Sequence, residues 1–172
     1  MILFITYVMA QKEKIAMNRL LEFYTDGAFS SRSEMGGWAA ICVEDNNIID
    51  RQSGYEPYST NNRMELTAFL SALENIATIE TGSTKVIIYT DSAYIANCFR
   101  DKWYIKWFEN GWKTSDKQPV KNQDLWTRII ALYIKYHKRF DIEIIKVQSH
   151  SGNKYNEIVD QMAVLKRREL ED

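Results

Sequence analysis

The sequence predicts an α/β fold in which helices flank a mixed sheet, and two observations predict it. Three short runs of aromatic and aliphatic residues come first and are separated by polar turns, as in an antiparallel meander. Helical and strand patterns then alternate toward the C-terminus, as in parallel strands joined by helices. The 172 residues, 45% of them hydrophobic, suffice for the core of one compact domain.

The first half of the chain holds the meander and one amphipathic helix. Its strands are expected at Leu20–Ala28, Trp38–Val43 and Ile48–Tyr55. A helix is expected at Asn62–Ile79, because apolar residues recur there at spacings of three and four. These residues are Ala68, Phe69, Ala72, Leu73 and Ile76.

The second half begins with Lys85–Thr90 (KVIIYT), a continuous apolar run that is typical of a strand covered on both faces. Asp91 and Ser92 follow it and open a helix. The remaining expected elements are helices at Ser92–Phe99, Lys102–Asn110, Lys121–His137 and Asn156–Arg168, with a strand at Asp141–Val147.

The charge of the chain is segregated, although the net charge of -1 gives no overall basic signal. Between Lys85 and Phe140, eleven Lys or Arg residues stand against five Asp or Glu residues, so the rest of the chain is acidic. This segment suits a surface that binds phosphates opposite a carboxylate cluster, and a solvated helix face explains it equally well.

The two cysteines favour a cytoplasmic protein, and the short apolar start does not predict a membrane anchor. Cys42 and Cys98 belong to no metal-binding or redox motif, so we expect buried free thiols in a reducing compartment. Met1–Ala10 (MILFITYVMA) is apolar but far shorter than the ~20 residues of a membrane span. A signal peptide would have Lys or Arg before the apolar run, and none precedes it here.

Two acidic residues follow the same local pattern. Asp26 in YTDG and Asp91 in YTDS each stand at the expected C-terminal end of an apolar strand, where α/β sheets hold ligands. Taken singly, each is more often a turn or helix cap.

Two further carboxylates lie on expected helices. Glu65 falls on the buried stripe of its helix, with helix-dipole compensation or an ion pair to Arg63 as the alternatives. Asp160 borders the apolar face of the last helix, with an ion pair to Arg167 or Lys154 as its alternative.

Convergence of these four carboxylates would require cations. Two carboxylates ~4 Å apart repel by ~4 kcal/mol at an effective dielectric constant of about 20. Oxygen ligands favour magnesium or manganese, and two such ions ~4 Å apart can activate a water and stabilise the leaving oxygen of a phosphodiester. The sequence is therefore compatible with phosphoryl transfer.

The segment Thr60–Leu66 (TNNRMEL) resembles bacterial ribonuclease H of type 1. The resemblance continues through YTDS, through GWKTSDKQPVKNQDLW at Gly111–Trp126, and through His150, Asn156 and Asp160 in QSHSGNKYNEIVDQMA. It covers residues 17–172, which would form the ribonuclease H domain, and leaves residues 1–16 as an N-terminal extension. TNNRMEL and the GWKT to DLW stretch are highly specific, whereas TDG or TDS alone is weak.

The resemblance implies a ribonuclease H-like fold, a five-stranded mixed sheet flanked by helices. Asp26, Glu65, Asp91 and Asp160 would be the catalytic, metal-binding carboxylates for two Mg2+ ions, with Mn2+ as a substitute. His150 matches a mobile histidine that helps proton transfer or product release. Its alternative is an ordinary exposed loop residue.

The implied activity is endonucleolytic cleavage of the RNA strand of an RNA/DNA hybrid by a monomer, leaving 5'-phosphate and 3'-hydroxyl ends. Thr60 and Asn61 would contact the hybrid backbone, Asn62 the RNA 2'-hydroxyl, and Asn156 a phosphate near the metals. Lys102–Lys121 resembles the basic protrusion that holds the DNA strand. Its expected contact residues are Trp103, Trp107, Lys113 and Ser115, and helix packing is the alternative for the tryptophans.

Three segments depart from the family pattern. The loop Ala28–Met35 lacks the usual glycines and prolines, Phe108–Asn110 replaces common basic residues, and Gln148-Ser149 stands where Lys-Gly is frequent. We expect weaker hybrid binding with unaltered chemistry.

Residues 1–16 and the activity each leave alternatives. Translation can begin naturally at Met17, or the apolar start can add an edge strand or a dimer contact. One rival function is a module that binds hybrids without cutting them, and four intact carboxylates argue against it. The other is a related nuclease acting on DNA ends or junctions, and TNNRMEL and the protrusion argue against that.

Overall fold

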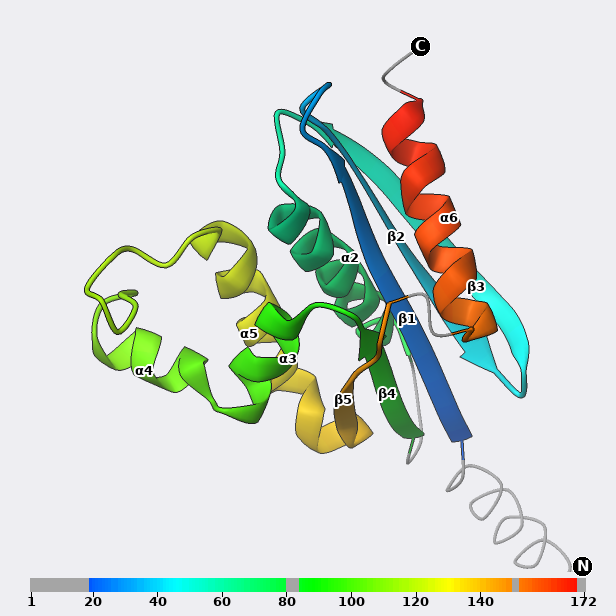
Figure 1. Cartoon of the computed structure of the whole chain (residues 1–172). Coiled ribbons are helices and arrows are strands. Elements are labelled where there is room, and N and C mark those ends of the chain that lie inside the picture. Colours follow the sequence, from blue (N-terminus) through cyan, green and yellow to red (C-terminus); the bar gives the residue numbers. More distant parts are fainter. Residues whose placement is uncertain (1–18, 80–83, 150–151, 170–172) are drawn as a thin grey trace, which may run out of the picture.

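A five-stranded mixed sheet organises the computed structural model, which describes residues 19–79, 84–149 and 152–169 (Figure 1). The strands lie in the order β3-β2-β1-β4-β5. The first three form the predicted antiparallel meander, and β1 pairs with β4, and β4 with β5, in parallel. The strands are β1 (Arg19–Ser30), β2 (Met35–Glu44), β3 (Asn47–Pro57), β4 (Thr84–Thr90) and β5 (Ile142–Lys146). The predicted fold class is confirmed.

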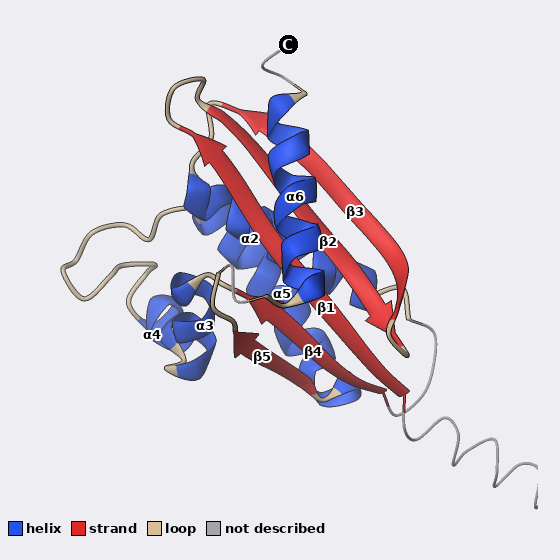
Figure 2. Ribbon diagram, turned by 45° about the vertical axis from the view of Figure 1, so that its right-hand side comes forward, coloured by secondary structure: helices blue, strands red, loops and turns tan. Residues whose placement is uncertain are grey.

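Helices cover both faces of this sheet (Figure 2). On one face, α6 packs against β1 and β2 around Tyr24, Ile41 and Val159. The other face carries the larger core, in which Phe23, Phe69 and fully buried Trp126 meet. The helices are α2 (Asn61–Ile76), α3 (Ala93–Arg100), α4 (Trp103–Glu109), α5 (Gln123–Phe140) and α6 (Lys154–Arg168). Among the described residues, no helix has the length and apolar character needed to cross a membrane.

The parallel pairing of β1 and β4 brings the two YTD segments together. Thr25 of β1 is in register with Thr90 of β4, so Asp26 and Asp91, the next residues, are neighbours. Contrary to the sequence expectation, Asp26 lies inside its strand, because β1 continues to Ser30 in antiparallel pairing with β2. Half of the expected loop at 28–35 is therefore strand, and residues 31–34 form the turn.

Gly27 allows α2 to approach β1 closely. A Cβ atom at Gly27 would lie 2.4 Å from the backbone N of Glu65 and 2.6 Å from the carbonyl carbon of Met64. Any side chain here would push the first turn of α2 away from the sheet. The glycine after Asp26 thus determines how near Glu65 can come to that carboxylate.

Helix ends differ from the sequence expectations by a few residues, and capping explains the start of α6. This helix begins at Lys154 because the Asn153 side chain accepts hydrogen bonds from the backbone N–H groups of Tyr155 and Asn156. The helix α2 ends at Ile76, three residues before the expected Ile79. The N-terminal extension and His150 lie outside the described residues.

Candidate active site

Three carboxylates from separate elements meet where β4 ends beside β1, the central strand of the sheet. Asp26 comes from β1, Glu65 from the first turns of α2, and Asp91 follows the last residue of β4. One carboxylate oxygen from each lies within 4.8 Å of the others. Asp26 and Glu65 are buried, and Asp91 is partly exposed. This spacing suits a shared divalent cation.

The electrostatics of the cluster favour the binding of a positive charge. Burial, and then the charges of Asp91 and Asp160, raise the pKa of Asp26 to about 7, although the Gly27 N–H donates to its Oδ1 at 2.7 Å. Burial and the charge of Asp26 likewise raise the pKa of Glu65 well above its ordinary value. Oε2 of Glu65 is buried and has no hydrogen-bond partner among the described residues. A cation would satisfy that oxygen and relieve the repulsion, so the residues fit a hard metal ion.

These carboxylates belong to a larger hollow of about 220 Å³, which we call the acidic pocket. Asp160 enters it from α6, on the opposite face of the sheet from α2. The other lining residues are Gly27, Asn61, Ser149, Asn156 and Glu157. The structure therefore brings all four predicted carboxylates to one pocket, with Asp160 outside the tight group of three.

The alternative roles of the carboxylates find no support in the described part of the chain. Arg63 pairs with Glu56 and Asp124 rather than with Glu65. Arg167 donates to the carbonyl of Phe29, and no ion pair joins it to Asp160. Ser92, not Asp91, caps α3 through its side chain.

Asp91 has a partner that the sequence did not predict. The hydroxyl of Ser149 donates a hydrogen bond to Oδ2 of Asp91 at 2.7 Å. Ser149 follows β5 by three residues, and the parallel pairing of β4 with β5 brings it beside Asp91. Its place next to His150 in the sequence was the only signal.

The predicted polar contact residues near the acidic pocket have different surroundings. Thr60 caps α2, and its hydroxyl accepts a hydrogen bond from the backbone N–H of Arg63 at 3.2 Å. Asn61 and Asn62 are exposed, and Asn61 also lines the acidic pocket. Asn156 is only 4% exposed and lies on the pocket wall, so its side chain is held in place. His150 is outside the described residues.

A second hollow, of about 410 Å³, lies at α4 and the segment after it, and we call it the tryptophan pocket. It contains all four residues predicted for the protrusion, namely Trp103, Trp107, Lys113 and Ser115. Trp107 is only 6% exposed and packs against Trp126 with 5.3 Å between ring centroids. Helix packing and pocket lining are thus both true of Trp107.

The tryptophan pocket also contains residues that sequence reasoning missed. They are Tyr94, Lys106, Asn110 and Thr114. Asn110 stands where a basic residue was expected, and its side chain donates to the carbonyl of Lys113 and accepts from the N–H of Lys113. These two bonds hold the turn that presents Lys113.

The sequence is similar to those of known ribonucleases H. The family described as RNase H matches residues 18–168. The ribonuclease H of Caldanaerobacter subterraneus subsp. tengcongensis is 42% identical over 146 residues, which are 85% of this chain and 90% of that one. The ribonuclease H of Acetivibrio thermocellus is 43% identical over 143 residues, 83% of this chain and 91% of that one.

Solved structures share the fold. LC9-RNase H1, described as a type 1 RNase H with the type 2 active-site motif, has a TM-score of 0.71 at 25% identity and covers 87% of this chain and 72% of its own. The RNase H domain of PFV has a TM-score of 0.71 at 22% identity and covers 87% of this chain and 95% of its own. LC11-RNase H1, solved in complex with an RNA/DNA hybrid, has a TM-score of 0.66 at 15% identity, with 88% and 99% covered.

Proposed function

Because the chain belongs to the RNase H family and is a ribonuclease H, we propose that it cuts the RNA strand of RNA/DNA hybrids internally with two Mg2+ ions. The products would carry 5'-phosphate and 3'-hydroxyl ends. The observation that carries this proposal is the acidic pocket, where three carboxylates converge and the buried Oε2 of Glu65 has no hydrogen-bond partner in the part of the chain that the structure describes.

Asp26, Glu65, Asp91 and Asp160 would hold the metal ions, and Mn2+ could replace Mg2+. When bound, the ions supply an activated water and stabilise the oxygen that leaves the phosphodiester. The charges of both Asp91 and Asp160 raise the pKa of Asp26, so Asp26 lies near both carboxylates. This proximity suits a residue shared by both ions.

Polar residues around the carboxylates would orient the RNA strand. Asn61 and buried Asn156 present amides to the acidic pocket and would bind backbone phosphate and sugar oxygens. Exposed Asn62 would contact the 2'-hydroxyl, the group that distinguishes RNA from DNA, and exposed Thr60 would contact the backbone. His150 would move a proton or assist product release.

The tryptophan pocket would hold the DNA strand. Lys106 and Lys113 provide cations for phosphates, and Trp103 offers a partly exposed ring beside them. The hybrid in the LC11-RNase H1 complex supports this substrate. We place the protein in the cytoplasm as a monomer made of one ribonuclease H domain, residues 17–172, with residues 1–16 as an extension.

A cleavage assay with end-labelled nucleic acids tests the proposal. The protein is incubated with an RNA/DNA hybrid, duplex RNA, duplex DNA and single-stranded RNA, in magnesium or in EDTA. Only the RNA of the hybrid should be cut, only in magnesium, and product ends should extend with polymerase as 3'-hydroxyls do. Asp91→Asn should abolish cutting, because it removes one charged ligand from the cluster.

The matched control is Asp45→Asn, the same chemical change in the β2–β3 turn, outside the acidic pocket. It should cut like the wild type. Hybrid binding without cutting in magnesium and manganese would make the protein a recognition module instead. Cutting of duplex DNA would favour the rival nuclease of DNA ends or junctions.

A further inference from the structure

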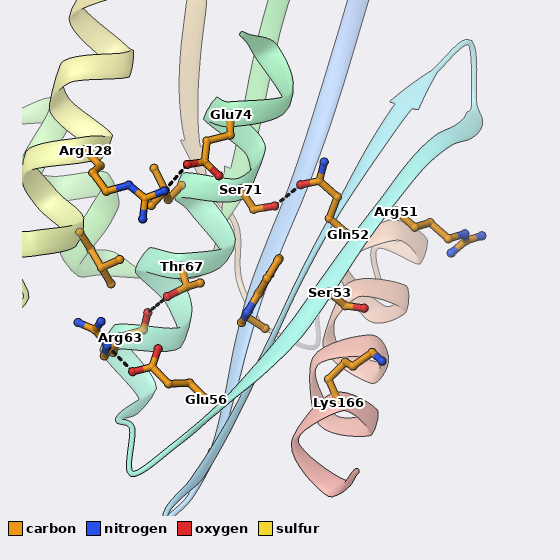
Figure 3. A pocket seen from close by; sticks show the side chains of 13 residues that line it. Arg51, Gln52, Ser53, Glu56, Arg63, Thr67, Ser71, Glu74, Arg128 and Lys166 are labelled. Atoms are coloured by element: carbon orange, nitrogen blue, oxygen red, sulfur yellow. Dashed lines mark hydrogen bonds and ion pairs between the residues drawn. The ribbon is translucent and has the colours of Figure 1, made fainter. Parts of the chain in front are cut away.

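Arg63 joins three separate elements through its side chain. Its Nε lies 2.6 Å from Oε1 of Glu56 at the end of β3, in the groove of about 670 Å³ between β3 and α2 (Figure 3). Its Nη1 and Nη2 contact the two carboxylate oxygens of Asp124, in the first turn of α5, at 3.1 and 2.9 Å. A two-pronged pair of this kind fixes orientation as well as distance. We call these contacts the Arg63 bridge.

On one side, the Arg63 bridge holds the turn of α2 that faces the acidic pocket. Asn61 and Glu65, which line that pocket, stand two residues before and two residues after Arg63. The backbone N–H of Arg63 is itself fixed by the Thr60 cap, and the Thr67 hydroxyl donates to its carbonyl at 2.8 Å. The backbone of this turn cannot move without moving Glu65.

On the other side, the bridge holds the turn of α5 that supports the tryptophan pocket. Trp126, two residues after Asp124, packs against Trp107 and donates from its Nε1 to the hydroxyl of Tyr94 at 3.2 Å. Both of these partners line the tryptophan pocket. The first turns of α5 thus contact and support two residues that line that pocket.

The start of α5 has an acidic residue, Asp124, in its first turn but no capping bond from the residue before it. Asn122 precedes it with φ 55°, a left-handed conformation, and forms no side-chain capping bond. Instead, Oδ1 of Asn122 lies 3.5 Å from Nη1 of Arg63, and Asp124 accepts from the same guanidinium. Contacts from α2 therefore hold the side chains of Asn122 and Asp124, although a guanidinium only donates and leaves the first N–H groups of α5 to other acceptors.

We propose that Arg63 is a positioning residue that sets the tryptophan pocket relative to the acidic pocket, so that one hybrid contacts both. This rests on the proposed function, in which the tryptophan pocket holds the DNA strand and the acidic pocket holds the metals. Two linked contacts strengthen binding only when their geometry permits simultaneous engagement. A shift of α5 against α2 would weaken the hybrid complex without touching the carboxylates.

The first experiment compares Arg63→Ala and Arg63→Lys with Arg128→Ala as the matched control. Arg128 pairs with Glu74 and also joins α5 to α2, but it lies farther along both helices and lines neither pocket (Figure 3). Arg63→Ala should raise KM for the hybrid about tenfold with a smaller change in kcat. Arg63→Lys should recover only part of this, because an ammonium group cannot reproduce the two-pronged contact. Arg128→Ala should leave KM unchanged.

Asp124→Ala separates positioning from simple charge. Removing a negative charge near a nucleic-acid surface should strengthen hybrid binding by electrostatics alone. If the Arg63 bridge positions the pockets, the same variant should weaken binding. Unchanged KM in Arg63→Ala, or tighter binding in Asp124→Ala, would overturn the proposal.

Two further measurements complete the test. Adding Lys113→Ala to Arg63→Ala should raise KM by less than the product of the single effects, since both act through the tryptophan pocket. Hydrogen exchange of the free protein needs no substrate and separates this proposal from the proposed function. Amides near Trp112 and Trp126 should exchange faster in Arg63→Ala than in Arg128→Ala, and equal rates would contradict the bridge.

Discussion

The acidic pocket and the tryptophan pocket are built in different ways. The acidic pocket is formed around β1 and the end of β4 at the middle of the sheet, and its carboxylates Asp26 and Glu65 are buried. None of its described residues has a positive φ. The tryptophan pocket stands on the seven-residue helix α4 and the turns around it, where Lys102, Trp112 and Lys117 adopt left-handed conformations.

This difference separates chemistry from binding. Residues held by central strands keep a fixed geometry, as catalytic carboxylates require. Residues on a short helix and turns open more easily, which suits a surface that adapts to a long substrate. Variants of the acidic pocket should therefore change kcat and metal affinity, and variants of the tryptophan pocket should change KM.

The largest effect is expected from Asp26→Asn. Cleavage should fall about a thousandfold, since one carboxylate of the cluster loses its charge. The metal-free protein should nevertheless melt at a higher temperature, because a buried charge beside Glu65 and Asp91 is removed. Calorimetry and a single-turnover assay measure the two. A lower melting temperature would show that the cluster is not strained by repulsion.

Gly27→Ala should damage the same pocket through the backbone. Its Cβ would overlap the backbone of Met64 and Glu65, so α2 must move away from β1, at about 3 kcal/mol of unfolding free energy. Magnesium affinity measured by calorimetry should fall as well. Gly36→Ala is the control, because the atoms nearest to its Cβ belong to the side chains of Met64 and Ser59 rather than to backbone. Equal losses in both variants would argue against a special role for Gly27.

The pH dependence of the metal-free protein gives a third comparison. The pKa of Asp26 is raised from 3.8 to about 7 by folding, so the folded state binds a proton more tightly than the unfolded state. The resulting stability is present at acidic pH and is lost as pH rises through 7. The carboxylates of Glu44 and Asp124, whose pKa values are lowered by ion pairs, are already ionised above pH ~5 and do not oppose this trend.

Urea unfolding in EDTA from pH 5 to 8 measures this effect. Stability should decrease toward pH 8, and magnesium should restore more of it at pH 8 than at pH 5. Asp26→Asn should flatten the profile. A wild-type profile that rises with pH would show that the cluster carries no raised pKa.

The fold and the acidic pocket were largely predictable from local sequence. Short apolar runs predicted the strands, and the repeated YTD pattern predicted Asp26 and Asp91 at strand ends, which the parallel pairing of β1 with β4 makes neighbours. Glu65 was recognisable because a carboxylate on a buried helical stripe needs a partner. The family resemblance then connected Asp160, whose helix lies on the other face of the sheet.

Contacts that depend on long-range pairing were not predictable. The bond from Ser149 to Asp91 requires β5 beside β4, and no local pattern reports that register. The true length of β1 depended on its pairing with β2 beyond Asp26. Arg63 was considered only as a partner of Glu65, because its real partners lie 7 and 61 residues away in the chain.

Lys113→Ala should have the smallest effect and should fall on binding alone. Lys113 is exposed in the tryptophan pocket, so losing one phosphate contact should raise KM a few-fold and reduce the log–log salt slope by about 1. The control is Lys85→Ala, which removes the same charge from the basic segment, where Lys85 pairs with Glu143. If both variants change KM equally, the basic segment binds the hybrid through its overall charge. The tryptophan pocket would then not be a distinct binding site. If only Lys113→Ala does so, with kcat unchanged, the DNA strand is held at the tryptophan pocket.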